Sequence, residues 1–372
     1  MKVSEKLKTW VEISRKAVKS NIKIFKTLVG KKTQLWAVVK SNAYGHGLIV
    51  FSKLADKAGV DGFCVDNVEE GICLRNAGIK KPILVLGPTL PVLFGRAKKY
   101  KITITISNRD ALAGFLKSRN KPDFHLKIDS GMRRQGFYPE EVPEIMNSLK
   151  KARTNFKGVF THFCAANDKN NSVFTDKQLN NFEKVLENLD NSGFKNLTRH
   201  AAATGAALID KKYHLDAVRI GIGLYGLLPS EELNAQFSEI KLNPVFSWHA
   251  AISEIKDIKK GDGIGYDLTE KVTKNSRAAV LPIGYWHGLP RAFSSLGLVL
   301  INSKPAKILG RVSMDLIMAD VTGIKCGVGD EAVIIGGQGD GEIAASEAAG
   351  KIGTNHYELI TRVNPLIERI IK

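Results

Sequence analysis

The sequence predicts an α/β protein in which a (β/α)8 TIM-like barrel is followed by a mainly antiparallel β domain. Three observations lead to this fold class. The chain has 372 residues, and a single hydrophobic core seldom grows beyond about 250–300 residues. Strand-like and helix-like segments alternate over the first two thirds, and strands joined by short Gly/Asp turns follow them. We therefore expect the barrel over residues 1–241 and the β domain over residues 242–372.

Eight short runs rich in β-branched and apolar residues are the predicted barrel strands, and segments with helical spacing separate them. They cover residues 35–40, 62–67, 82–87, 102–107, 124–129, 158–163, 197–202 and 217–223. Strands that are apolar on both faces and alternate with helices favour a closed parallel barrel. The alternative, an open doubly wound sheet, would more naturally carry a G-x-G-x-x-G loop after its first strand, and that loop is missing from the sequence there.

The second domain is indicated by VFSWHAAISEIKDI (245–258), RAAVLPIGY (277–285) and DEAVIIGGQG (330–339), with one clear helix near IAASEAAGKIG (343–353). Short turns between such runs are typical of antiparallel pairing. The early strand TWVEIS (9–14) precedes the first barrel helix, and it can pair into this second domain instead of the barrel.

Composition indicates an ordinary globular protein of the cytoplasm. No apolar run is long enough to span a membrane, and the N-terminus lacks the apolar core of a secretory signal. The four cysteines form no C-x-x-C pair, which suits a reducing compartment. We expect Cys64 and Cys164 to be buried apolar residues, and we assign no metal ligands.

The net charge of +18 raises the possibility of nucleic-acid binding. However, the lysines are spread along the chain, and no arginine-rich arm, zinc spacing or aromatic RNA-binding strand accompanies them. A solvated basic surface is the better interpretation, so we expect no nucleic acid and no membrane among the partners.

Polar residues gather where the predicted barrel strands end, which is where barrel enzymes carry their active sites. They are Lys40, Tyr44, Lys127, Asp129, Arg134, His162, Thr204, Arg219, Gly221 and Tyr225. A lysine amine can form a Schiff base with an aldehyde, and the turns after strands seven and eight are the usual phosphate position of a barrel. Pyridoxal phosphate (PLP) carries both groups, so it is the cofactor that we expect.

The stretch AVVKSNAYGHG (37–47) resembles the cofactor-lysine signature of alanine racemases, and the resemblance extends over nearly the whole chain. Further matching stretches are KIDSGMRRQGF, GVFTHF, AVRIGIGLYG, GIGYDLT, LPIGY, GRVSMDL and HYELITRV. The resemblance implies a homodimeric PLP enzyme that interconverts L- and D-alanine. Its small-molecule substrate is an amino acid, and its product supplies D-alanine for peptidoglycan.

The resemblance also implies roles for individual residues around the cofactor. Lys40 would hold PLP covalently, Arg219 would meet the pyridine nitrogen, and Arg134 would meet the phenolic oxygen. His162 would pack beside the ring, and Leu86 would add an apolar wall. The phosphate would be surrounded by Tyr44, Thr204, Gly221, Ile222 and Tyr357. Lys127 matches a lysine that is carbamylated in many members.

Two bases are needed to remove an α-proton from one face and return it to the other. The resemblance assigns them to Lys40 and to Tyr266 of the other subunit. Tyrosine has a pKa of about 10 in water, so a base role at neutral pH needs nearby cations. We expect a hydrogen-bond chain from Tyr266 through His162 to Arg219. Near the substrate the resemblance places Arg134, Tyr285, Met314 and Asp315, with Arg291 and Arg311 at the entrance.

Departures from the family pattern leave the substrate open. Thr204 stands where serine is usual, and Trp286-His287 stands where Ala-Asp is usual. A serine or broad-specificity racemase on the same scaffold is the closest alternative. A barrel-type PLP decarboxylase and a PLP-homeostasis protein are more distant ones, since the decarboxylase motifs are not evident and the homeostasis proteins are single barrels.

Overall fold

The computed structural model describes residues 6–168, 170 and 172–372, which form two compact units. The first, here called the barrel unit, consists of Lys16–Ala43 and Phe51–Asn243. The second, the β unit, combines Pro244–Lys372 with Tyr44–Val50 and the chain up to Arg15. The boundary after residue 241 stays a prediction, and the short segment at 44–50 was not expected in the second unit.

The barrel unit contains a closed ring of eight parallel strands in chain order, which confirms the predicted α/β fold class. The strands are β2 (Gln34–Val38), β3 (Gly62–Val65), β4 (Ile83–Pro88), β5 (Thr103–Ile106), β6 (Phe124–Lys127), β7 (Phe156–Phe160), β8 (Thr198–His200) and β9 (Ala217–Ile220). β2 pairs with both β3 and β9, which closes the ring. Their residues are almost all buried, as expected for strands that face a packed interior on one side and helices on the other.

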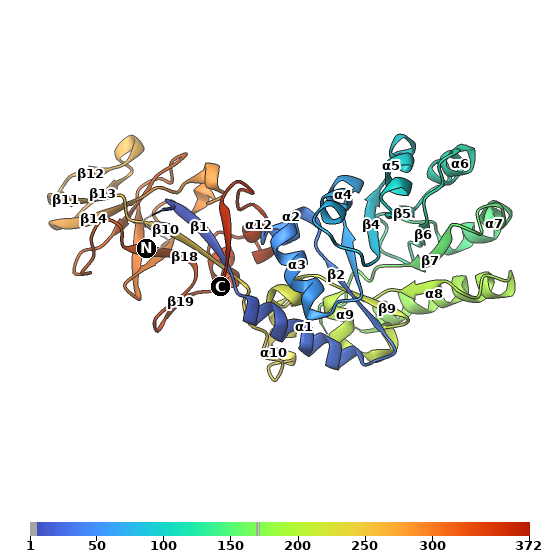
Figure 1. Ribbon diagram of the computed structural model, residues 1–372. Coiled ribbons are helices and arrows are strands. Elements are labelled where there is room, and N and C mark those ends of the chain that lie inside the picture. Colours follow the sequence, from blue (N-terminus) through green and yellow to red (C-terminus); the bar gives the residue numbers. More distant parts are fainter. Residues whose placement is uncertain (1–5, 169, 171) are drawn as a thin grey trace. The chain divides into compact units, whose positions relative to one another are not determined.

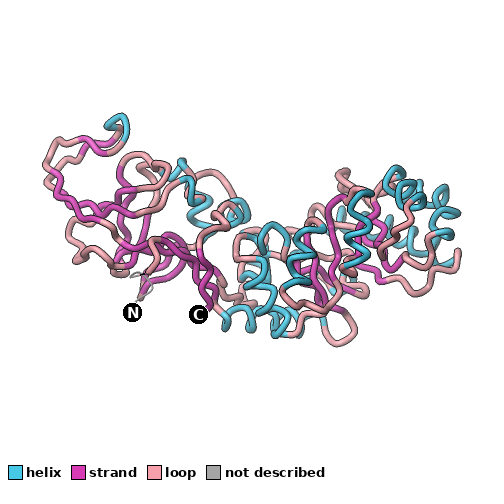
Figure 2. Tube along the Cα trace, turned by 45° about the horizontal axis from the view of Figure 1, so that its top comes forward, coloured by secondary structure: helices cyan, strands magenta, loops and turns pink. Residues whose placement is uncertain are grey.

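Helices follow the strands and cover the outside of the ring (Figure 2). They are α1 (Arg15–Val29), α3 (Leu48–Ala58), α4 (Val68–Asn76), α5 (Phe94–Lys99), α6 (Arg109–Lys117), α7 (Val142–Lys151), α8 (Ser172–Asn191), α9 (Thr204–Ile209) and α10 (Glu231–Gln236). In α1 the buried residues Val18, Ile22 and Phe25 recur at helical spacing, so one face is apolar. Asn67 and Asn108 cap α4 and α6 by accepting hydrogen bonds from the backbone N–H three residues on.

The β unit is built on a mostly antiparallel sheet with the strand order β11-β14-β17-β16-β15-β18-β10-β1-β20, and β19 pairs with β18. The strands are β1 (Thr9–Ile13), β10 (Phe246–Ala251), β11 (Glu254–Ile258), β14 (Ser276–Leu281), β15 (Leu298–Ile301), β16 (Lys304–Leu309), β17 (Ile317–Asp320), β18 (Glu331–Gln338), β19 (Gly341–Ile343) and β20 (Glu368–Ile371). A small hairpin of β12 (Gly263–Ile264) and β13 (Glu270–Lys271) is separate.

The early strand belongs to this second sheet. β1 pairs antiparallel with β10 and parallel with β20, so the chain begins in the β unit before it enters the barrel. The predicted helix near 343–353 is present as α11 (Ala345–Lys351), and α12 (His356–Thr361) is a second one that the sequence pattern did not indicate. At six residues, α12 is too short for a clear apolar period.

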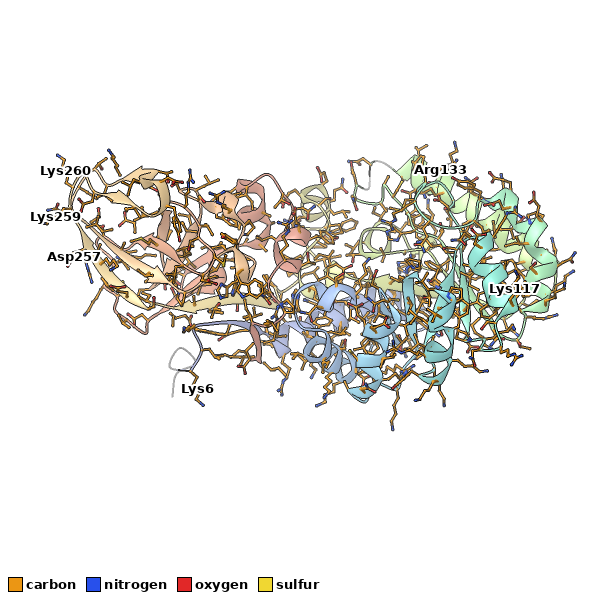
Figure 3. All side chains as sticks on the ribbon, turned by 90° about the horizontal axis from the view of Figure 1, so that it is seen from above. Lys6, Lys117, Arg133, Asp257, Lys259 and Lys260 are labelled. Atoms are coloured by element: carbon orange, nitrogen blue, oxygen red, sulfur yellow. The ribbon has the colours of Figure 1, made fainter. Side chains whose placement is uncertain are left out.

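The described residues include no helix that is long and apolar enough to cross a membrane. Lys259 and Lys260 point away from the ribbon at the edge of the view in Figure 3, and both are exposed, as is Lys117. Exposed lysines of this kind agree with the interpretation of the positive net charge as a solvated basic surface.

Candidate active site

Lys40 begins a short left-handed turn directly after β2. The turn, α2 (Lys40–Tyr44), has positive φ angles of 55°, 56°, 53° and 52° at Ser41, Asn42, Ala43 and Tyr44. Left-handed residues other than glycine are uncommon singly, and consecutive ones are strained. Backbone hydrogen bonds brace the turn: Val39 N–H donates to Cys64 O at 2.8 Å, and Ala43 N–H donates to Val39 O at 2.8 Å. The predicted strand over 35–40 ends at Val38, and the half-buried Lys40 is held in a defined turn.

Arg219 is the buried centre of the barrel rim. From β9 its Nη2 donates to Thr161 O and Ala201 O, each at 2.8 Å, and contacts His162 Nδ1 at 3.3 Å. Its Nη1 lies 2.7 Å from His200 Nδ1. Burial lowers the pKa of Arg219 to about 10, so it still carries its charge at neutral pH. The guanidinium is therefore a fixed cation.

Two histidines lie behind Arg219, and sequence reasoning missed both. His200 Nε2 lies 2.8 Å from His125 Nδ1, and the His200 ring stacks on Phe160 at 5° and 4.8 Å between centroids. Burial lowers the pKa of His200 well below its ordinary value and that of His125 to about 3, so both are neutral. An arginine only donates, so His200 Nδ1 accepts from Arg219 and His200 Nε2–H donates to His125.

Gly158 makes room for this pair. A Cβ atom on Gly158 would lie 2.5 Å from His125 Cε1, closer than any real packing contact. The signal that could have revealed the network is a histidine in each of two buried strands, FHLK and TRH. A lone buried histidine is a common structural feature, so the sequence alone gave no reason to join the two.

Lys127 is buried at the end of β6, with its ammonium nitrogen 5.0 Å from the centre of the Phe160 ring. Burial, followed by the charges of Arg219 and Arg134, lowers the pKa of Lys127 to about 7. Among the residues that the structure describes, it makes no ion pair with a carboxylate. The amine is thus partly neutral at physiological pH, which is unusual for lysine.

Asp129 orders the loop that carries Arg134. Its carboxylate accepts hydrogen bonds from the backbone N–H groups of Gly131, Arg133 and Arg134 at 3.0, 2.9 and 2.7 Å. Burial acts to raise the pKa of Asp129, but these backbone hydrogen bonds together lower it below its ordinary value. The Arg134 side chain itself is exposed, so the loop fixes its backbone rather than its guanidinium.

The turns after β8 and β9 meet through Thr204 and Gly223. The buried Thr204 Oγ1 accepts from Gly223 N–H at 3.3 Å, and a Cβ on Gly223 would lie 2.8 Å from Thr204 Cγ2. Gly221 and Ile222 precede Gly223 in the same turn. Tyr225 is buried and donates to Val38 O at 2.8 Å, so it braces β2.

Other predicted barrel residues are placed as follows. His162 is half-buried, and its pKa is lowered well below the ordinary value by burial and then by Arg219. Leu86 is half-buried in β4. Burial raises the pKa of Cys64 to about 12, so its thiol stays protonated. The expectation that Cys164 is buried was wrong: β7 ends at Phe160, so Cys164 lies in the exposed loop beyond the strand.

The β unit brings together a different set of predicted residues. Tyr285 N–H donates to Ser313 O at 3.0 Å, and Trp286 N–H donates to Met314 O at 3.0 Å, so Tyr285 lies beside Met314 and Asp315. Tyr266 is 70% exposed, and the neighbouring Asp267 forms an ion pair with Arg311. Tyr44 and Tyr357 also meet in this unit, with 6.1 Å between ring centroids. Burial raises the pKa of Tyr357 above its ordinary value.

No group of three or more His, Cys, Asp or Glu side chains suited to a metal ion occurs in the described part of the chain. A closed parallel barrel with a buried arginine in its last strand, together with a mostly antiparallel β unit, is an architecture found among barrel enzymes.

Comparison with known proteins gives the family. Residues 13–229 match the model of the alanine racemase N-terminal domain, and residues 245–371 match that of the C-terminal domain. The alanine racemase of Halothermothrix orenii is 36% identical over 370 residues, which cover 98% of this chain and 97% of that protein. The enzyme of Desulforamulus reducens is 37% identical over 368 residues, which cover 97% and 98%. The chain belongs to the alanine racemase family, whose members are isomerases.

Solved structures agree with this assignment. The alanine racemase of Bacillus anthracis with bound L-Ala-P superimposes with a TM-score of 0.93 at 34% identity, covering 98% of this chain and 95% of that one. The alanine racemase of Clostridium difficile 630 in complex with cycloserine gives a TM-score of 0.90 at 32% identity, covering 98% and 96%.

Proposed function

We propose that this protein interconverts L- and D-alanine with PLP as cofactor, using Lys40 and the partner subunit's Tyr266 as its two bases. The observation that carries the proposal is the fixed, buried guanidinium of Arg219 at the rim of the barrel, in a chain of the alanine racemase family. We further propose a cytoplasmic homodimer that supplies D-alanine for peptidoglycan.

The barrel rim fits PLP by its charge. Burial lowers the pKa of Lys127 most, the charges of Arg219, Arg134 and Lys40 lower it further, and the charge of Asp129 opposes them. An anionic ligand would relieve this excess of positive charge. When bound, PLP supplies an aldehyde for a lysine amine and a conjugated ring that stabilises negative charge at the substrate Cα.

Arg219 fits the ring nitrogen by its donors. A guanidinium has five N–H groups. Those of Nη2 and one of Nη1 are directed to the carbonyls of Thr161 and Ala201 and to the rings of His162 and His200. The Nε–H and the second Nη1–H have no hydrogen-bond partner among the described residues, and they can donate to a ring nitrogen. Because arginine keeps its proton at neutral pH, that nitrogen would stay an acceptor, which limits charge delocalisation and favours simple proton return over transamination.

Racemisation requires one base on each face of the substrate, so that a proton removed from one face can be returned to the other. In this proposal Lys40 would remove or return the proton on one face, and Tyr266 of the partner subunit would do so on the other. The 70% exposure of Tyr266 supports a role completed by a second copy of the chain. His162 Nδ1 lies 3.3 Å from Arg219 Nη2, and the low pKa of His162 keeps the ring neutral. In this proposal Nδ1 accepts a hydrogen bond from Arg219, and the other ring nitrogen donates one to Tyr266 of the partner subunit.

The remaining assignments follow the family. Thr204, Gly221, Ile222, Tyr44 and Tyr357 are proposed to contact the phosphate, with Leu86 as an apolar wall and Arg134 at the phenolic oxygen. Arg134, Tyr285, Met314 and Asp315 are proposed to contact the substrate. Lys127 is proposed to be carbamylated: its neutral amine attacks CO2 and releases a proton, which replaces a cation by an anion near Arg134 and Arg219.

A serine or broad-specificity racemase is the second candidate, favoured by the residues beside Tyr285. Trp286 is 58% exposed. Burial lowers the pKa of the half-buried His287, and the charge of Asp315 acts against this lowering. A racemisation assay with L-Ala, L-Ser, L-Lys and L-Arg, with and without added PLP, tests both candidates. Alanine turnover that depends on PLP is expected, and the absence of turnover with all four substrates would contradict the proposal.

A further inference from the structure

The Gly45-His46-Gly47 loop is pressed against the C-terminal segment within the β unit. Gly45 has a φ angle of +84°, and a Cβ atom on it would lie 2.0 Å from Ile360 O in α12. Gly47 has a φ angle of +93°, and a Cβ there would lie 3.3 Å from Arg369 Cγ. Only glycine combines a left-handed backbone with such close approach. Both glycines are therefore explained by contact with α12 and with Arg369.

Arg369 joins this loop to the end of α12. Its Nε and Nη2 donate to Gly45 O at 3.2 and 2.9 Å. Its other donors reach carbonyls just beyond the helix: Nη1 donates to Asn364 O at 2.7 Å and to Ile367 O, and Nη2 donates to Val363 O at 3.2 Å. The guanidinium thus satisfies backbone carbonyls on both sides of one junction.

The charge of Arg369 is not explained by an ion pair. Within the described ranges its side chain has no carboxylate partner, and burial lowers its pKa to about 10. A partly buried cation without a counterion loses hydration energy, and apolar packing would hold a loop at lower cost. The planar guanidinium, with its five N–H donors, can fix the distance between the Gly45 loop and the end of α12, which apolar packing does not do.

We propose that Arg369 is a positioning residue that sets Tyr44 against Tyr357. Tyr44 precedes Gly45, Tyr357 lies in α12, and their ring centroids are 6.1 Å apart. His46 adds a further anchor: it is fully buried, its Nδ1 lies 3.1 Å from Tyr44 O, and its ring meets Phe246 edge-on at 5.2 Å. Since both tyrosines are proposed to contact the cofactor phosphate, this inference rests on the proposed function.

The test compares PLP with pyridoxal, which lacks the phosphate. Cofactor-free protein is titrated with each ligand, and binding is followed by absorbance. Arg369→Met is expected to raise the Kd for PLP about tenfold or more, the size of effect that outer-shell residues have on metal sites. Its Kd for pyridoxal is expected to stay within about twofold of wild type, because the tyrosines act on the phosphate.

Arg362→Met is the matched control. Arg362 lies in the same segment, is exposed, and only bridges Glu358 at 3.2 Å, so its variant is expected to bind both ligands as wild type does. If Arg369→Met does not fold, Arg369→Gln is used, which retains one amide in place of the fork and is also expected to weaken PLP binding.

An unchanged Kd for PLP in the Arg369 variant would overturn the inference. Equal weakening of PLP and pyridoxal would overturn it as well, since that result indicates a general loss of structure. Wild-type protein that binds neither ligand would refute the proposed function itself and this inference with it, so the two failures are distinguishable.

Discussion

The two compact units hold their predicted site residues in different ways. In the barrel unit Arg219 and Thr204 are each 3% exposed and hydrogen-bonded to their own chain, and Lys127 is 6% exposed with its ammonium over the Phe160 ring. In the β unit Tyr266 is 70%, Met314 54% and Tyr285 45% exposed. Their backbones are ordered while their side chains reach solvent. We interpret the barrel residues as organised by their own chain and the exposed ones as completed by a second copy.

The largest expected effect is that of removing the lysine at the barrel rim. Lys40→Ala should lower kcat for alanine racemisation by at least about 10³-fold, because both cofactor attachment and one base are lost. Lys53→Ala, a change at an exposed lysine of α3, is the control and should leave turnover unchanged. Residual turnover by Lys40→Ala within about tenfold of wild type would exclude Lys40 as a base.

Tyr266→Phe tests the role of the exposed residues of the β unit. Removal of one hydroxyl should cost about 10²–10⁴-fold in turnover. The free energy of unfolding should change by less than about 0.5 kcal/mol, because the ring is retained and is mostly exposed within its own chain. Solvent deuterium exchange should fall more for one alanine enantiomer than for the other. Equal exchange into both enantiomers would contradict the two-base assignment.

Gly158→Ala tests how tightly the buried residues of the barrel unit are packed. The added methyl group would displace His125 from its contact with His200, and overpacking of a core costs about 1–3 kcal/mol of unfolding free energy. Gly327→Ala is the matched control, since nothing lies within 4 Å of a Cβ there. Denaturant melts of the two variants make the comparison, and equal stability would mean that the histidine pair is loosely packed.

A pH dependence of stability is also expected from Lys127. Its pKa is about 7 in the folded protein, whereas an unfolded lysine has a pKa near ~10.4, so the unfolded chain binds the extra proton between these values. The buried Lys127 therefore destabilises the fold fully below about pH 7, and this destabilisation should be relieved as pH rises from about 7 toward ~10.4. Lys127→Met should flatten this slope in CO2-free buffer, while the exposed Lys117→Met should retain it. Parallel slopes for the two variants would refute the lowered pKa.

The fold could be predicted from the sequence, whereas the roles of the individual site residues stay predictions. The alternation of strands and helices predicts the barrel, and strand ends predict the neighbourhood of Arg219, because topology alone brings parallel strand ends together. The left-handed turn at 41–44 could not be predicted, since none of its residues is glycine. The link between Gly45 and Arg369 joins residues 324 apart in the chain, and no local pattern indicates such a contact.

The central claim is that Lys40 holds PLP at the barrel rim, and chemical trapping tests it most directly. Borohydride reduces the carbon–nitrogen double bond between a lysine and PLP to a stable amine, which marks the lysine for peptide mass spectrometry. The account predicts a single phosphopyridoxyl group on the peptide that contains Lys40. Its appearance on another lysine, or on none after incubation with PLP, would contradict the account.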